Sequence, residues 1–326
     1  MKKVLAIVLA LCMVFALCAC SGGAKKTDEI KIDQDINFLV HVKAGGALDV
    51  RARVIAEYLA KELGVNVTVT NVPGAGGATC MTQAKTQPTG DYDLVFATAT
   101  VFGSLPIFTP DLAYTLDDFI PLAPVDVESF GLYACPAQTG IESFEDLVEY
   151  SKENKIIFGS GGVGNITHLM QAYLYKTLGM DAETLTHNGG IEGITNCMGG
   201  HNVVLMVGQE TARPYVESGD IVPILTFSAE DYTGYEGKTV PSVLKVGGKD
   251  DNVYQSLMVI VCNATVDEAH EALLRDALNK VINLPECQAD LKEVGLIYTP
   301  TMNEEELLTY LKDEYEAMGS IVEFVG

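Results

Sequence analysis

The sequence predicts an α/β protein whose sheets contain parallel strands. Short apolar runs with the two-residue period of a strand alternate along the chain with longer stretches that have the period of an amphipathic helix. At Ala44–Gly46 and again at Gly159–Gly164, a glycine-rich loop joins the end of a strand to the start of a helix. Strands that alternate with helices in this way favour parallel pairing, because each helix returns the chain to the edge where the next strand begins.

The first of these units covers residues 36–63. The strand Ile36–Val42 places alternate apolar side chains on one face, and the loop Ala44–Gly46 then lets the backbone turn tightly. The helix Ala47–Leu63 follows, and no large side chain of the loop covers its first free N–H groups. We expect this helix start to attract anions, because unpaired N–H donors and the helix dipole act together there.

A second unit of the same kind begins near residue 155. The strand Lys155–Phe158 leads into Gly159–Gly164, and a helix over Ile166–Leu178 follows with Asn165 as its candidate N-cap. The loop again offers backbone N–H groups, together with the hydroxyl group of Ser160. Two such helix starts that face each other across a cleft would hold a carboxylate without any lysine or arginine.

Both loops belong to a longer series of motifs. The first unit reads Gly45-Gly46, then Asp49–Arg53, then the helix end Leu63-Gly64, then a strand and Asn71–Gly77. In this order and at this spacing, the motifs resemble the solute receptors of tripartite tricarboxylate transporters, also called the Bug family. The second loop resembles the same family from Phe158 to Leu169; the matching residues are Gly159, Ser160, Gly162, Gly164, His168 and Leu169.

The resemblance extends from residue 36 to the C-terminus and implies a type II periplasmic-binding-protein fold. Two α/β lobes would be joined by two crossing strands, near Gly131–Cys135 and Ser256–Cys262, with a ligand cleft between the lobes. Such a receptor closes on a small organic acid and passes it to membrane transporter subunits, and it performs no chemistry. We expect it to act as a monomer without a cofactor.

The implied lobes divide the chain in a simple way. The first lobe takes residues 36–130 together with 260–326, and the second lobe takes residues 131–259. Three helical patterns near the C-terminus are expected to pack on the first lobe; they are Val266–Asn283, Pro285–Val294 and Asn303–Gly319.

The N-terminus is typical of a bacterial lipoprotein precursor. Two lysines precede the apolar run Val4–Leu17, which is shorter than the ~20 apolar residues that a membrane-spanning helix needs. The ending Leu17-Cys18-Ala19-Cys20 resembles a lipobox, which implies a signal peptide over residues 1–19, lipidation of Cys20 and a flexible tether over residues 20–35. The mature protein would be anchored to the outer face of the cytoplasmic membrane. The alternative is an ordinary cleaved signal with an incidental cysteine.

Charge and cysteine content restrict the partners further. The formal net charge is −23, and the predicted signal peptide holds lysines but no acidic residue, so the mature chain is more acidic still. This charge excludes nucleic acid as a partner and means that any anion site acts locally.

The five cysteines of the mature domain have no metal-site spacing and suit small buried apolar positions, although a disulfide stays open: Cys80, Cys135, Cys197, Cys262 and Cys287.

Several further residues are candidate ligand contacts. Thr98 and Thr100 end the third strand, at the edge where open sheets bind ligands. Asp49 lies in the first turn of its helix, where it either contacts the ligand or pairs with Arg53 at i,i+4. Gln209 either faces the cleft or sits in a surface turn.

Together the predicted ligand contacts are Ala44, Gly45, Gly46, Asp49, Thr98, Thr100, Ser160, Gly161, Gly162, Asn165, His168, Asn188, Gly189 and Gln209. For His168, a structural hydrogen bond near the helix start is the alternative to ligand contact. At Asn188-Gly189 and at Gln209 the chain departs from the family pattern, so the ligand stays open among di- and tricarboxylates, acidic amino acids and aromatic acids.

Two enzyme hypotheses also fit parts of the second loop. Gly159–Gly164 matches the dinucleotide-binding pattern, but the acidic residues Asp181 and Glu183 precede the next strand instead of ending it. Ser160 suggests a hydrolase, but Phe158 stands where a nucleophile elbow needs its first glycine. The histidines lack metal-site spacing. A receptor that informs a sensor kinase instead of a transporter is a further alternative.

Overall fold

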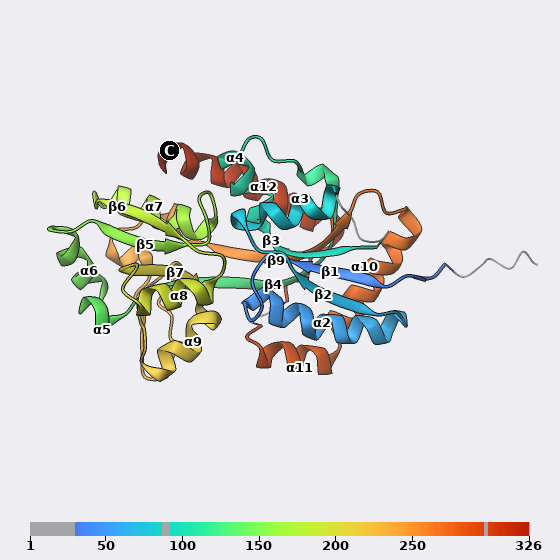
Figure 1. The fold of residues 1–326 in the computed structure, drawn as a ribbon, viewed down its shortest axis with the longest axis horizontal. Coiled ribbons are helices and arrows are strands. Elements are labelled where there is room, and N and C mark those ends of the chain that lie inside the picture. Colours follow the sequence, from blue (N-terminus) through green and yellow to red (C-terminus); the bar gives the residue numbers. More distant parts are fainter. Residues whose placement is uncertain (1–29, 87–91, 297–298, 326) are drawn as a thin grey trace, which may run out of the picture. The chain divides into compact units, whose positions relative to one another are not determined.

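The computed structural model describes residues 30–86, 92–296 and 299–325 (Figure 1). The chain divides into two units, Met1–Lys31 and Ile32–Gly326, and the architecture below is that of the second unit. The predicted signal peptide, Cys20 and the tether as far as residue 29 lie outside the described residues. Among the helices that are described, none is both long enough and apolar enough to cross a membrane.

One sheet is built from the N-terminal strands. β1 (Ile36–Val40) pairs in parallel with β2 (Val67–Asn71) on one side and with β3 (Leu94–Thr98) on the other. β9 (Gln255–Asn263) lies antiparallel to β3, and β4 (Phe119–Ala134) lies antiparallel to β9. We call this sheet and the helices packed on it the first lobe.

A second sheet is built around the far half of β4. β7 (Val204–Gly208) and β8 (Val222–Thr226) flank that half and run antiparallel to it. β5 (Ile156–Ser160) pairs in parallel with β7, and β6 (Ala182–Thr186) pairs in parallel with β5. We call this sheet and its helices the second lobe.

β4 and β9 form the connection between the lobes and lie side by side in Figure 1. β4 pairs with β9 as far as Ser129 and with β7 from Phe130 onward, so one unbroken strand serves both sheets. The predicted strand near Gly131–Cys135 is therefore only the end of a much longer one. Its first half escaped prediction because Pro121 and Pro124 break the strand pattern; the structure accommodates them at two register shifts.

α2 (Ala47–Leu63) has the bounds that the sequence predicts. It buries Ala52, Ile55 and Leu59 along one face, and Gly64 ends it in the left-handed conformation with φ of 73°. α10 (Glu268–Ile282) and α11 (Pro285–Glu293) pack beside α2 in one apolar cluster over the first sheet. α3 (Ala78–Thr86) covers the opposite face of that sheet.

The second sheet is also covered on both faces. α6 (Phe144–Ser151) and α7 (Ile166–Thr177) lie on one face, and α8 (Gly190–Met198) and α9 (Gln209–Ser218) lie on the other. Ser143 caps α6 in a capping box with Asp146. The remaining short helices are η1 (Ala75–Gly77), η2 (Ala99–Val101), α4 (Ser104–Phe108), η3 (Leu116–Asp118), α5 (Pro136–Thr139), η4 (Val243–Val246) and η5 (Asp250–Asn252).

α12 (Glu304–Val325) packs on both lobes, and the prediction that it packs on the first lobe alone is wrong. Leu307 and Leu311 belong to a core cluster of the first lobe, whereas Met318 and Ile321 belong to the core of the second. The helix extends beyond its predicted end at Gly319, and this extra length reaches the second lobe. Between these two contacts, the buried Glu314 accepts a hydrogen bond from the Tyr254 hydroxyl.

All five cysteines of the domain are buried and carry free thiols, in agreement with their interpretation as small buried apolar residues. Burial raises the pKa of the Cys80, Cys197 and Cys262 thiols to about 12, so these side chains stay uncharged.

Glu314→Gln tests the burial of the acid in α12. Burial raises the pKa of Glu314 to about 7, although the Tyr254 hydroxyl opposes the shift. Because the native state then binds more protons than the unfolded state, wild-type stability falls as pH rises from about 4.5 to about 7. Relative to wild type, we expect the variant to gain ~1–3 kcal/mol of unfolding free energy between pH 5 and pH 8 in urea titrations. Glu316→Gln, which alters an exposed acid of the same helix, is the control and should show no such gain.

Candidate functional site

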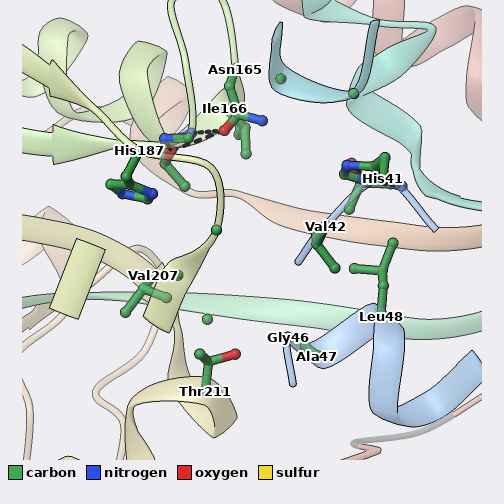
Figure 2. A pocket seen from close by; sticks show the side chains of 18 of the residues that line it. His41, Val42, Gly46, Ala47, Leu48, Asn165, Ile166, His187, Val207 and Thr211 are labelled. Atoms are coloured by element: carbon green, nitrogen blue, oxygen red, sulfur yellow. Dashed lines mark hydrogen bonds between the residues drawn. The ribbon is translucent and has the colours of Figure 1, made fainter. Parts of the chain in front are cut away.

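A cavity of about 120 Å³ lies between the two lobes, where the parallel strands of both sheets end. In Figure 2, His41, Val42 and Leu48 of the first lobe lie across this cavity from His187 and Val207 of the second. Its lining residues are His41, Val42, Gly46, Ala47, Leu48, Gly74, Gly76, Gly77, Thr98, Glu128, Phe130, Gly161, Asn165, Ile166, Thr167, His187, Asn188, Gly189, Gly190, Met206, Val207, Gly208 and Thr211.

On the first lobe, the wall of the cavity is the start of α2. Gly46 is the N-cap residue, and no side chain caps the helix. The Asp49 carboxylate instead holds the loop before the helix: it accepts hydrogen bonds from the Gly45 N–H (2.8 Å) and the Asn71 amide (2.8 Å) and pairs with Arg53 (2.8 Å). Burial opposes the charge, but the hydrogen bonds from Arg53, Gly45 and Asn71 outweigh it and lower the pKa of Asp49. The first N–H groups of α2 are thereby left to face the cavity.

On the second lobe, the opposing wall is the start of α7. Asn165 caps this helix as predicted, and its side-chain oxygen accepts a hydrogen bond from the Thr167 N–H (3.0 Å). The Gly161 N–H donates to the Thr167 hydroxyl (2.8 Å), which fixes the glycine loop against the first helical turn. Gly46 of the first glycine loop and Gly161 of the second thus line the same cavity.

Two more helix starts reach the same cavity, and the sequence did not reveal them. α8 begins at Gly190 after Gly189, whose φ of 153° and ψ of 154° suit glycine alone, and no side chain caps it. α9 begins after Gly208, and Thr211 of its first turn lines the cavity. Four helix N-termini thus surround one space. None of the described residues that line it is a lysine or an arginine.

Three titratable side chains line the cavity. The Thr98 N–H donates to His41 Nε2 (3.3 Å), and burial lowers the pKa of His41 to about 4, so its ring is neutral at physiological pH. Burial likewise lowers the pKa of His187 to about 4. Glu128, on β4, has its pKa raised to about 7 by burial. The sequence analysis did not identify His41 or Glu128 as cavity residues. The available signals were the position of His41 just after β1 and that of Glu128 as an acid in the largely apolar strand β4.

Six of the fourteen predicted contacts line the cavity: Gly46, Thr98, Gly161, Asn165, Asn188 and Gly189. Their contact with a ligand stays a prediction. The other eight are placed outside the lining, and they are Ala44, Gly45, Asp49, Thr100, Ser160, Gly162, His168 and Gln209.

Several of these eight have structural partners instead. The Ser160 hydroxyl is buried against that of Thr184 (2.7 Å). The Nδ1 atom of His168 accepts a hydrogen bond from the Gly164 N–H (3.4 Å), which agrees with the structural alternative that the sequence analysis gave for this residue. Gln209 is buried inside the second lobe, where its amide donates to the Thr226 hydroxyl (2.9 Å), so neither the cleft nor a surface turn describes its place.

The lobes also touch at both rims of the cavity. Lys43 of the first lobe forms an ion pair with Glu192 of the second. On the other rim, a Cβ atom added to Gly162 would lie 3.2 Å from the backbone nitrogen of Gly76. These contacts across the gap show that the structure holds the lobes closed around the cavity.

The chain resembles known proteins over most of its length. The profile of the "Tripartite tricarboxylate transporter family receptor" matches residues 51–326. A UPF0065 protein in the gbd 5′ region of Cupriavidus necator is 27% identical over 297 residues, which are 89% of this chain and 87% of that protein. A UPF0065 protein of Bordetella bronchiseptica is 28% identical over 210 residues, and this match spans 64% of this chain but only 62% of the relative.

A solved structure confirms the fold. MatC from Rhodopseudomonas palustris, determined with bound malate, superposes with a TM-score of 0.79 at 19% identity; the match covers 90% of this chain and 99% of that chain. At this identity the likeness concerns the fold alone. The periplasmic binding protein BugD also superposes, with a TM-score of 0.81 at 22% identity over 90% of this chain and 98% of that chain. The predicted type II periplasmic-binding-protein fold, with two α/β lobes and two crossing strands, is confirmed.

Asp49→Ala tests whether this carboxylate supports the α2 start. The Gly45 N–H, the Asn71 amide and Arg53 all lose their hydrogen bonds to this carboxylate, so we expect the unfolding free energy to fall by ~1–3 kcal/mol in urea titrations. Glu57→Ala is the matched control, because Glu57 forms an exposed i,i+4 pair with Lys61 on the same helix. It should change stability by less than about 0.5 kcal/mol. Equal losses in the two variants would contradict the supporting role of Asp49.

Proposed function

Because the chain belongs to the tripartite tricarboxylate transporter receptor family, we propose that it captures a small carboxylate-bearing solute outside the cell membrane and delivers it to a transporter of that kind. Members of this family are solute receptors and not enzymes. The observation that carries the proposal is the cavity between the lobes, with four helix N-termini and no cationic side chain among its described lining residues.

Helix N-termini suit a carboxylate for two reasons. Each presents unpaired N–H donors, and each carries a partial positive charge of about half an elementary charge. In an enclosed cavity these fixed dipoles act with little screening from water, and hydrogen bonds to a carboxylate are among the strong ones. Such a site therefore binds an anion locally even though the whole chain is strongly acidic.

The malate bound to MatC supports this ligand class by analogy, since malate is a small dicarboxylate and MatC shares the fold. The other side chains that line the pocket set the choice among acids, and in this chain they include Asn188 and Glu128.

We further propose that the receptor is a lipoprotein. The sequence Leu17-Cys18-Ala19-Cys20 follows an apolar run of signal-peptide length, and lipidation of Cys20 would tether the domain to the outer face of the cytoplasmic membrane. A receptor held there delivers its solute over a short distance. Mass spectrometry of membrane-extracted protein should find a diacylated N-terminal cysteine at position 20.

Ligand-induced stabilisation tests the receptor function directly. The protein without residues 1–20 is unfolded and refolded to remove any bound solute, then heated with di- and tricarboxylates, acidic amino acids, aromatic acids, NAD and neutral sugars. One class of acid at 100 times its dissociation constant should add ~2.7 kcal/mol to the unfolding free energy. Stabilisation by NAD or sugars alone would contradict the proposal.

Gly46→Val tests the role of the α2 start. The backbone of Gly46 has φ of −72° and ψ of 163°, which valine tolerates. Its Cβ atom would lie 3.1 Å from Val42 Cγ2 and 3.2 Å from the Lys43 carbonyl oxygen, so small shifts of these neighbours accompany the change. We expect binding of the stabilising acid to weaken at least tenfold while the protein still folds, measured by isothermal titration calorimetry. Gly319→Val is the control, because nothing lies within 4 Å of a Cβ atom added there. Unchanged affinity in Gly46→Val would remove α2 from the binding site.

A further inference from the structure

Glu128 is the one acidic side chain among the described residues that line the cavity. It projects from β4 at the point where this strand leaves its pairing with β9 and joins the second sheet. A carboxylate in this position is unexpected in a site otherwise built to bind an anion, because two negative charges in one enclosed cavity repel each other.

The structure makes room for this carboxylate but gives it no partner. A Cβ atom added to Gly208 would lie 1.9 Å from Glu128 Oε1, so the absence of a side chain at Gly208 creates the space that the carboxylate occupies. Among the described residues, no hydrogen bond or ion pair to the Glu128 carboxylate is present. The group is therefore free to interact with a ligand.

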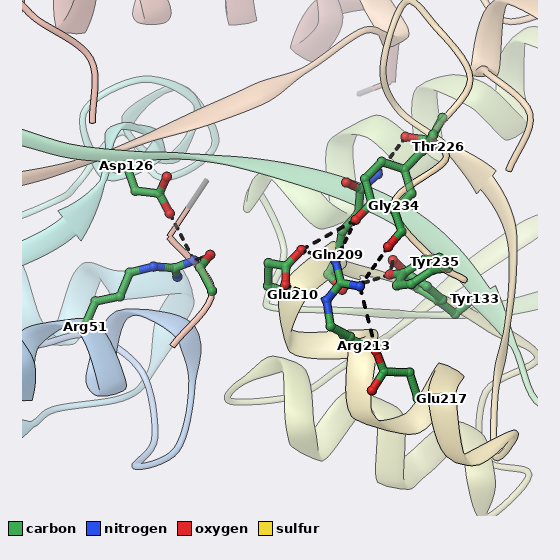
Figure 3. Close-up of polar contacts among 12 residues, drawn as sticks. Arg51, Asp126, Tyr133, Gln209, Glu210, Arg213, Glu217, Thr226, Gly234 and Tyr235 are labelled. Atoms are coloured by element: carbon green, nitrogen blue, oxygen red, sulfur yellow. Dashed lines mark hydrogen bonds and ion pairs between the residues drawn. The ribbon is translucent and has the colours of Figure 1, made fainter. Parts of the chain in front are cut away.

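The charged groups around Glu128 do not supply a cation either. Asp126 lies on the same strand, Arg51 faces it from α2 and Glu210 faces it from α9. Arg51 already pairs with Asp126 (2.9 Å), and Arg213 pairs with Glu210 (2.6 Å), as Figure 3 shows. Both cations are thus matched by acids of their own. The rings of His41 and His187 are neutral, so Arg51 alone offsets the charge of Glu128, and only in part.

We propose that Glu128 selects the solute by pairing with its ammonium group, so that the ligand is an amino acid and not a plain di- or tricarboxylate. The inference rests on the receptor function proposed above. The helix N-termini would hold the α-carboxylate of the ligand, and Glu128 would accept hydrogen bonds from the neighbouring ammonium group. The ammonium group of the ligand then pairs with Glu128 and its carboxylate pairs with the helix N-termini, so no two like charges repel each other in the enclosed site.

A protonated Glu128 that donates a hydrogen bond to a second ligand carboxylate is the competing arrangement, and the two differ in their pH dependence. Burial raises the pKa of Glu128 to about 7 in the unliganded protein, with Asp126 and Glu210 adding to the shift and Arg51 opposing it. An ammonium group would lower that pKa again, so binding releases a proton and affinity rises with pH. A plain carboxylate would raise it further, so affinity would fall with pH.

The test uses matched pairs of ligands that differ in the amino group alone. Isothermal titration calorimetry compares L-aspartate with succinate, L-glutamate with glutarate and L-phenylalanine with 3-phenylpropionate, on refolded wild type. We expect one amino acid to bind at least tenfold more tightly than its partner without the amine. Its affinity should fall about tenfold or more from pH 7.5 to pH 5.5, and binding at pH 6 should release close to one proton when buffers of different ionisation enthalpy are compared.

Two variants complete the experiment. Glu128→Gln should lose at least tenfold in affinity for the amino acid and lose the pH dependence. Glu217→Gln, which alters an exposed acid on α9, should keep both. Wild type that binds the plain acid as tightly as the amino acid, or takes up a proton on binding, overturns the role of Glu128 but leaves the receptor function intact. Failure of all six acids to bind overturns the role of Glu128, and it overturns the receptor function as well if no acid of the wider panel stabilises the protein. Because the proton release is measured on wild type, the test stands even if Glu128→Gln folds poorly.

Discussion

The site depends on one constraint, the parallel direction of the strands that enter it. β1 in the first sheet and β5, β6 and β7 in the second end at the same cavity. Each is followed directly or after a short loop by a helix, so α2, α7, α8 and α9 begin near the ends of their strands. Because a helix carries its positive partial charge at its start, the topology itself concentrates positive potential between the lobes. Cationic side chains are not needed for that purpose.

The crossing strands connect the two walls of the cavity. β4 is paired on both sides of the point where it changes sheets, and β9 runs beside it through the first lobe. The buried ion pair between Arg51 and Asp126 ties α2 to β4, so the helix start in the cavity wall is fixed to the strand that carries Glu128. α12 adds a second bridge by packing on both lobes. A group on β4 therefore lies on an element that both lobes share.

The sequence was sufficient for the fold and for half of the cavity wall. Glycine loops between a strand and a helix identify the α2 and α7 starts. Glycines at such a place let the backbone turn and leave the helix N–H groups uncovered, and this pattern can be recognised in the sequence. The α8 and α9 starts were not recognised: α8 follows the glycine pair Gly189-Gly190, and α9 follows the single Gly208. Side-chain direction was the main source of error. Ser160 and Gln209 lie at strand ends beside the cavity, yet each turns into the second lobe, and sequence position does not fix that choice.

The central claim is that backbone N–H groups of helix starts, and no cationic side chain, hold the carboxylate. A crystal structure with the bound solute tests it most directly. The account predicts carboxylate oxygens about 2.7–3.1 Å from backbone nitrogens at the starts of α2 and α7, α8 or α9, with no lysine or arginine nitrogen within about 4 Å. A carboxylate held by a lysine or arginine side chain, or a solute bound outside the cavity between the lobes, would contradict it.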